Sequence, residues 1–288
     1  MSGFVMTPNP PWKAIGWFTA FLVLAYLPVV TGLVKQWNND EDMGHAFFVP
    51  IVAAYVAWDS REKILNINPE PSFFGIFLMI WGMLQLYLGA LGAEFFLQRS
   101  ALLISLVGLV LATGGWKLLR ALAFPLSLLI FMIPIPAIVY NRITFPLQLF
   151  ASSVAENVLL FLDIPVNRDG NVLTLASQTL SVVEACSGIR SLLSLTFLSL
   201  VYAYFFDKRP AMRWYLLLTT IPIAIIANAG RVTITGILSE KVSPEMARGF
   251  YHEVEGWVVF MIAGLLLALT HLFLSRFLNW REKHALTA

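Results

Sequence analysis

The 288-residue sequence has few charged residues and a single cysteine. Asp, Glu, Lys and Arg make up 12% of it, about half of the roughly 25% that is usual in soluble domains. This composition excludes a soluble globular fold. A formal net charge of +2 gives no indication of nucleic-acid binding. One cysteine also excludes an internal disulfide and any metal site built from several cysteines.

Apolar residues make up 58% of the sequence and gather in long runs. The runs cover residues 14–34, 46–58, 73–92, 101–114, 120–140, 188–206, 213–229 and 256–275. A helix needs about 20 residues to cross a hydrocarbon core of about 30 Å, and the second and fourth runs are short of this. The pattern predicts an all-α polytopic membrane protein with about eight transmembrane helices, in a single domain over residues 1–288. No cleavage site follows Lys13, so we expect the first span to serve as the insertion signal.

Two segments differ from these runs. The segment 144–162 mixes Leu and Phe with five polar side chains, which favours an interfacial or cavity-lining helix. These side chains are Gln148, Ser152, Ser153, Glu156 and Asn157. Further on, the Asp169–Gly170 step and the apolar stretches 172–175 and 180–183 predict a small β-hairpin that leads into the next helix. An edge strand there could bind an extended peptide by strand addition.

The Lys and Arg residues predict the orientation in the membrane. If the eight runs span and 144–162 lies at an interface, one side receives eleven of the nineteen basic residues. They are Lys13, Arg61, Lys63, Lys117, Arg120, Lys208, Arg209, Arg213, Arg276, Arg281 and Lys283. That side is expected to be cytoplasmic. Cys186, Arg231 and His252 would then all lie on the outer side.

Cys186 lies in the segment EACSGIRSL, where strand-like sequence changes to a long apolar helix. The free amides of a helix that begins at Ser187 or Gly188 would favour a thiolate and could stabilise an oxyanion. Arg190, one turn along, would add positive potential. This pattern predicts a nucleophilic thiol. The alternative is an inert cysteine that serves as a small buried apolar residue.

Arg231 follows the apolar run 213–229, in the segment NAGRV. One interpretation is a snorkelling arginine that anchors the end of a span. The other is a permanent cation that holds a thiolate or binds the oxyanion of a tetrahedral intermediate. Asn228, one turn earlier, could orient it.

His252 precedes the last apolar run, in the segment YHEVEGW. An imidazole titrates near neutral pH, so His252 could be the general base and acid for the thiol, or only a solvated polar group. Glu255 is available to fix its tautomer. His45, in GHAFFVP, is a rival for the base. Asp42 and His45 lack a second carboxylate–histidine pair, so we expect no metal.

Together these segments resemble the bacterial exosortases, integral membrane enzymes that process proteins bearing a short C-terminal sorting signal. The resemblance covers nearly the whole chain and rests on the order GHAFFVP, IPIPA, FPLQLFA, LDIPV with a following GN, EACSGIRSL, NAGRV and YHEVEGW. It implies that Cys186, Arg231 and His252 form the catalytic set, without a cofactor. It also implies a place in the bacterial inner membrane, in contact with membrane lipid, with the site facing the periplasm.

The resemblance further predicts a thiol protease or transpeptidase that acts through a thioester. Its substrates would be exported proteins whose tail has a Pro-Glu-Pro-like motif, an apolar span and a basic end. Many exosortases have a further soluble domain after the last span, whereas this chain stops at Ala288. If that function is needed, we expect a separate accessory protein to supply it.

Two other classes stay open. Glu156, Asn157 and Arg231 are groups that could line the polar path of a transporter or channel, although the sequence has no inverted repeat. A membrane acyltransferase could instead use His45 or His252 on a lipid or glycan.

Overall fold

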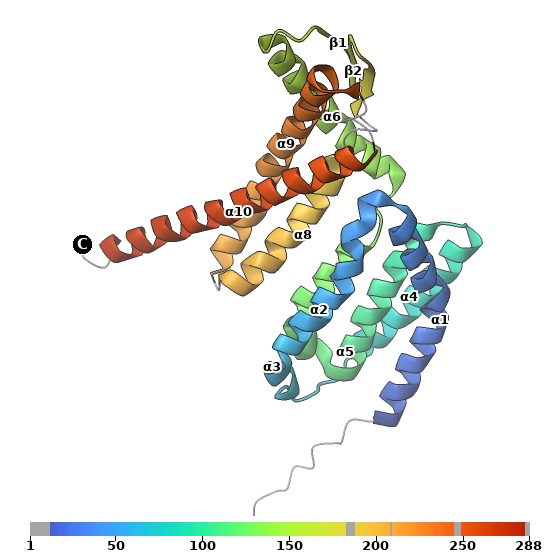
Figure 1. Ribbon diagram of the computed structural model, residues 1–288. Coiled ribbons are helices and arrows are strands. Elements are labelled where there is room, and N and C mark those ends of the chain that lie inside the picture. The colour runs from blue at the N-terminus through green and yellow to red at the C-terminus, as the bar shows by residue number, and fades with distance from the viewer. Residues whose placement is uncertain (1–11, 183–187, 208, 245–248, 286–288) are drawn as a thin grey trace, which may run out of the picture. The chain divides into compact units, whose positions relative to one another are not determined.

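The computed structural model describes residues 12–182, 188–207, 209–244 and 249–285 (Figure 1). Cys186 and Ser187 lie outside the described residues, as do the side chains of Arg190, His252 and Glu255. By its internal contacts the chain divides into two units, Met1–Pro136 and Ala137–Ala288, and each is described by itself.

The first unit is a group of helices. Its elements are α1 (Trp12–Asn39), η1 (Glu41–Phe47), α2 (Phe48–Asp59), α3 (Arg61–Leu65), α4 (Phe73–Leu91), α5 (Phe95–Leu128) and η2 (Leu129–Met132), where η denotes a 3₁₀ helix. Polar side chains cap α4 and α5: Ser72 accepts a hydrogen bond from the Phe74 amide and Glu94 accepts one from the Leu97 amide. Such caps satisfy amides that have no partner within the helix.

Helices α4 and α5 pack through glycines. A Cβ atom at Gly75 would lie 2.2 Å from the Ala112 nitrogen, and one at Gly108 would lie 2.8 Å from the Met79 nitrogen. The buried residues of α4 are all glycines, whereas large side chains such as Phe73 are exposed. Small residues at a helix contact and large apolar residues outside are typical of helices surrounded by lipid.

Gly115 interrupts α5. It has φ 72° and ψ −164°, and a Cβ atom there would lie 1.9 Å from the Glu70 carbonyl oxygen. Only glycine combines this backbone conformation with so close an approach. The predicted run 101–114 and the first part of the run 120–140 therefore belong to one helix with a kink. The second run is then interrupted, because η2 follows α5 and residues 133–136 are not helical.

The second unit has α9 at its centre. Its elements are α6 (Ala137–Phe161), β1 (Val166–Asp169), β2 (Val172–Leu175), β3 (Thr179–Ser181), α8 (Gly188–Phe206), α9 (Pro210–Lys241) and α10 (Gly249–Ala285). Pro210 begins α9, at the position where proline fits a helix best. Helix α9 contacts α6, α8 and α10. Their shared core includes Leu195 of α8, Leu216 of α9 and Leu267 of α10.

The three strands form an antiparallel sheet in the order β1-β2-β3. The pairing of β2 with β3 confirms the predicted hairpin, while β1 was missed. Gly170, with φ 62°, lies in the turn between β1 and β2. The buried face of the sheet packs on α6 and α9, and its core includes Leu173, Leu180, Val182, Leu159 and Val232.

The polar residues of segment 144–162 lie within α6, and several of them hold the sheet. Gln148 Oε1 accepts a hydrogen bond from Asn171 at 3.0 Å, and Glu156 pairs with Arg168 at 2.6 Å. Ser152 Oγ lies 3.1 Å from the Gly170 carbonyl oxygen. The prediction of a separate interfacial helix is therefore not confirmed, because these groups have protein partners.

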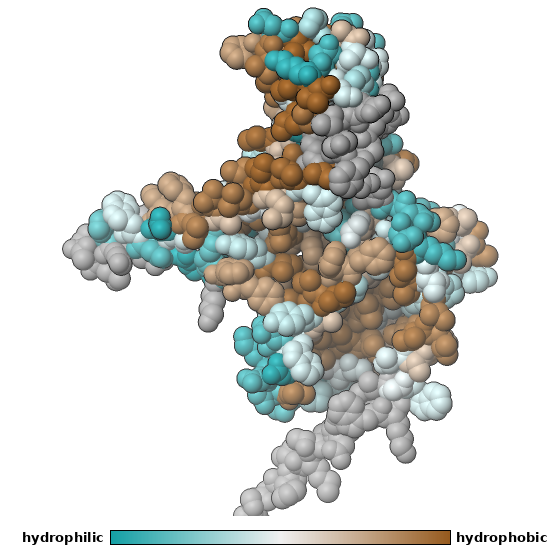
Figure 2. Space-filling view, viewed as in Figure 1, coloured by the Kyte–Doolittle hydropathy of each residue, from teal (hydrophilic) through white to brown (hydrophobic). Residues whose placement is uncertain are grey.

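Among the described residues, six helices are long and apolar enough to cross a membrane. They are Thr19–Asn39, Phe73–Leu91, Phe95–Met132, Ala137–Phe161, Ala211–Lys241 and Gly256–Trp280. Apolar side chains cover much of the visible surface (Figure 2). The chain is a mostly helical multi-pass membrane protein, as predicted. The count of eight spans is not confirmed, since α2 is short and Leu192–Phe206 of α8 is a shorter apolar helix.

Candidate active site

Arg231 lies inside α9, which continues past it to Lys241. Only 7% of the residue is exposed. A snorkelling arginine would end its helix and reach toward water. The burial of Arg231 instead favours the interpretation of a cation kept within the protein.

The Arg231 guanidinium lies against Gly256 of α10. A Cβ atom at Gly256 would lie 3.2 Å from Nη2, 3.3 Å from Cζ and 3.5 Å from Nη1 of Arg231. These three guanidinium atoms lie at similar distances from the Cβ position of Gly256, so the flat face of the group is turned toward this glycine. The absence of a side chain at residue 256 makes this approach possible.

His252 is one turn before Gly256 in α10. Residues four apart share a helix face, so position 252 lies on the face of α10 that meets Arg231. Position 252 therefore lies one turn from the glycine that Arg231 contacts. Glu255 belongs to the same turn of α10. The side chains of His252 and Glu255 lie outside the described residues.

Cys186 also lies outside the described residues, but the chain is described on either side of it. Val182, fully buried, shares a core cluster with Ala229 and Val232, which flank Arg231 in α9. On the other side, α8 begins at Gly188 with Arg190 in its first turn. Both flanks of Cys186 therefore belong to the unit that holds Arg231.

The turn before β3 is fixed to the end of α9. The Ser177 amide donates to Glu240 Oε2 at 3.1 Å. Gln178 Nε2 donates to Ser239 Oγ at 2.5 Å and to the Pro244 carbonyl at 3.3 Å. These bonds fix the turn before β3 to the end of α9. Strand β3 precedes Cys186 in the sequence, and α9 is the helix that carries Arg231. The bonds join residues more than sixty apart, and sequence analysis did not find them.

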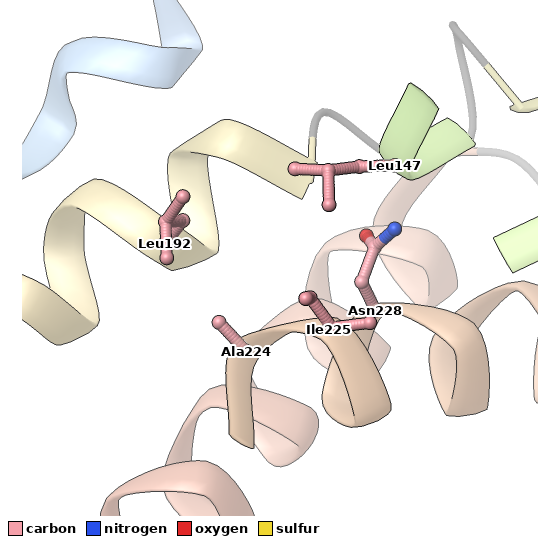
Figure 3. A pocket seen from close by; sticks show the side chains of 5 residues that line it. All are labelled: Leu147, Leu192, Ala224, Ile225 and Asn228. Carbon is pink, nitrogen blue, oxygen red and sulfur yellow. The ribbon is translucent and has the colours of Figure 1, made fainter. Parts of the chain in front are cut away.

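Asn228 is buried one turn before Arg231 and lines a pocket. The pocket is small, with about 10 Å³ of space for the centre of a water-sized sphere. Its other lining residues are apolar and come from α6, α8 and α9: Leu147, Leu192, Ala224 and Ile225 (Figure 3).

His45, the rival base, belongs to η1 in the first unit, whereas Arg231 and position 252 belong to the second. Burial lowers the pKa of His45, and backbone hydrogen bonds with Phe131 and Asp42 partly offset this. The ring is therefore mostly neutral near pH 7. Within the described residues, no three His, Cys, Asp or Glu side chains gather as a metal site would require.

Sequence analysis missed a polar cluster that joins α8 to α10. Two of its members, Asp207 and Arg209, lie between α8 and α9. Arg209 Nη2 donates to Asp207 Oδ2 at 2.7 Å, and His271 Nε2 lies 3.3 Å from the same oxygen. The Tyr202 hydroxyl lies 3.0 Å from His271 Nδ1. The only sign in the sequence was a histidine within an apolar run.

The comparisons with known proteins agree with the motifs. No curated protein and no solved structure matches the chain. A family model described as Transmembrane exosortase (Exosortase_EpsH) matches residues 37–269, which is most of the chain and includes Cys186, Arg231 and His252. The chain therefore belongs to the transmembrane exosortase family, as its sequence predicted.

Proposed function

We propose that this protein is a membrane-embedded cysteine protease or transpeptidase that cleaves the C-terminal sorting tails of exported proteins through a thioester on Cys186. Membership of the exosortase family supports a transmembrane enzyme of protein sorting. The observation that carries the chemistry is the buried Arg231 guanidinium, held against Gly256 one turn from position 252. Strand β3, which precedes Cys186 in the sequence, packs on α9, the helix that carries Arg231.

In the first half-reaction the Cys186 thiolate attacks the carbonyl carbon of the scissile peptide bond. The C–S bond forms and the carbonyl electrons move to the oxygen, whose negative charge Arg231 stabilises. Collapse of this intermediate breaks the C–N bond. Protonated His252 gives its proton to the leaving amine, which departs with the membrane tail. A thioester and a neutral imidazole remain.

In the second half-reaction an acceptor attacks the thioester. His252 takes the acceptor's proton, the C–S bond breaks, and the thiolate and the imidazolium are restored. Water as the acceptor makes the enzyme a protease, and an amine makes it a transpeptidase. Either outcome uses the same three residues.

Arginine suits this role because it stays protonated and its planar group presents several donors. In a buried site an ion is poorly screened, so its interaction with a developing oxyanion is stronger than in water.

The proposed place is the bacterial inner membrane, with the site on the periplasmic side. The six apolar helices and the family support a multi-pass membrane protein. The Lys and Arg distribution supports this orientation for eight spans with residues 144–162 at an interface. A full crossing by α6, with the other spans unchanged, would place Cys186 on the cytoplasmic side. Labelling of Cys186 with a membrane-impermeant thiol reagent in intact cells tests it, and protection of Cys186 until the membrane is opened would contradict it.

The function is tested by co-expression with an exported reporter that ends in a three-part sorting tail. We expect the wild-type chain to release the reporter from its tail and Cys186→Ala to leave it intact. Cleavage that persists in Cys186→Ala would contradict thiol chemistry. Absence of cleavage by both chains, at equal membrane levels, would favour transport or acyl transfer.

A further inference from the structure

The backbone of β3 has two sides with different partners. In the β2–β3 pairing, the Leu175 amide donates to the Gln178 carbonyl, and the Val182 amide donates to the Asn171 carbonyl. Hydrogen-bonded and non-hydrogen-bonded pairs alternate along an antiparallel ladder. Residues 178, 180 and 182 therefore bond toward β2, in the register that pairs Leu180 with Leu173.

The alternation directs the backbone groups of Thr179 and Ser181 away from β2. Each has one N–H and one C=O on the free side of the strand, so four groups lie along this edge. No other strand pairs with β3 among the described residues, where the sheet ends at this strand. Thr179 is exposed and Ser181 is half-buried. The edge also lacks the charged or proline residues that often block such edges.

The position of this edge links it to the proposed reaction. Leu180 and Val182 pack in the same cluster as Ala229 and Val232 of α9, so the strand lies at the level of Arg231 along this helix, against a different face from the one that carries Arg231. Figure 1 shows the sheet beside α6 and α9 within this unit. After β3 the chain continues through residue 182 toward Cys186. A peptide that paired with β3 would thus lie beside a strand that leads to the proposed nucleophile.

We propose that the free edge of β3 binds the substrate as an added strand, through the backbone groups of Thr179 and Ser181. The occupant is the extended segment of the exported protein that precedes its membrane tail. This inference rests on the proposed function and adds the mode of substrate recognition. Four alternating donors and acceptors fit a peptide backbone, and they do not distinguish one side chain from another. Strand addition also holds the scissile peptide extended, the form that a nucleophile can reach.

Two proline variants test this mode. Thr179→Pro and Ser181→Pro each remove one outward N–H and leave the bonds to β2 in place, because proline fits an edge position whose N–H faces outward. We expect each to lower kcat/KM for the tail reporter by about 3- to 10-fold, the effect of one hydrogen bond. The loss should appear mainly in KM.

Thr179→Val and Ser181→Ala are the matched controls. They change the same side chains and keep the backbone N–H groups, so we expect kcat/KM within about twofold of wild type. Labelling of Cys186 by a thiol reagent should proceed at the wild-type rate in all four variants, which shows an intact site. Controls that lose as much activity as the prolines would overturn the proposal.

A second test leaves the enzyme unchanged. Single ester bonds replace successive amides of a synthetic tail substrate before its cleavage site, and each ester removes one N–H. We expect losses at positions two residues apart, since alternate residues of an added strand face β3. A flat profile, with cleavage still dependent on Cys186, would overturn strand addition and leave the proposed function standing. Cleavage independent of Cys186 would instead contradict the proposed function.

Discussion

The guanidinium of Arg231 lies against the backbone of Gly256, with Nη2 3.2 Å from the place of a Cβ atom. Most Cβ contacts are longer than this, so any side chain at residue 256 must displace the arginine. The displacement would be small for alanine and larger for valine. If Arg231 binds the oxyanion, its position governs the rate of the chemical step.

We therefore expect Gly256→Ala to lower kcat for reporter cleavage several-fold and Gly256→Val to lower it further, with similar membrane levels. Gly264→Ala is the matched control, because its Cβ would make an ordinary contact of 3.8 Å with Leu198 of α8. It should leave kcat unchanged. Equal effects of Gly256→Ala and Gly264→Ala would show that helix packing, not Arg231, is disturbed.

Replacement of Arg231 tests its charge and its shape separately. Removal of an oxyanion donor typically costs about 10²- to 10³-fold in kcat, and we expect this of Arg231→Ala. Arg231→Lys should recover only part of the loss, since an ammonium lacks the planar donor array. Arg276→Ala, an exposed arginine of α10, should have no effect. Full activity of Arg231→Ala would show that Arg231 has no catalytic role and serves only the structure.

The two candidate bases give different outcomes. We expect His252→Gln to abolish cleavage and His45→Gln to retain it, as measured by kcat at several pH values. The lowered pKa of His45 leaves it uncharged near neutral pH, so its loss should not change the pH profile there. The reverse pattern would make His45 the base and overturn the assignment of His252.

The cluster around Asp207 should stabilise the fold. Hydrogen bonds from Arg209 lower the pKa of Asp207 from 3.8 to about 2, against the opposing effect of burial, and His271 contributes a further bond. A carboxyl with a lowered pKa stabilises the folded state above its unfolded pKa, here 3.8. That contribution falls as the pH drops toward 2. At neutral pH the lowered pKa of Asp207 adds about 2 kcal/mol to the free energy of unfolding.

We expect Asp207→Asn to lower the thermal midpoint at pH 7 in detergent, and the difference from wild type to shrink below pH 4. Glu70→Gln is the control, since Glu70 pairs with Lys117 on the exposed surface and such pairs contribute little. An equal midpoint for Asp207→Asn and wild type at pH 7 would contradict a stabilising role.

Hydropathy predicted the class of this fold because lipid imposes long apolar helices. It did not predict how the runs combine. The kink at Gly115 and the approach of Glu70 depend on a contact between distant residues. The polar side chains of α6 were assigned to an interface because their partners, Asn171 and Arg168, lie on strands that sequence alone does not position.

The site residues were proposed from the sequence, and their catalytic roles stay predictions. Arg231 and His252 carry reactive groups that the sequence displays directly, and the exosortase motifs named them together. Gly256 has no side chain to mark its role, which only the packing of α9 on α10 reveals. The strand β1 has the sequence VNRD, with a single apolar residue, so it lacks the alternation of apolar and polar residues that predicts a strand.

The most direct test of the account is capture of the covalent intermediate. Purified protein is mixed with a tail substrate, quenched in acid and weighed by intact mass spectrometry. We predict an added mass equal to the fragment before the scissile bond, located on Cys186, removed by hydroxylamine and absent from Cys186→Ala. Cleavage by the wild type with no such adduct, or an adduct on another residue, would contradict a thioester at Cys186.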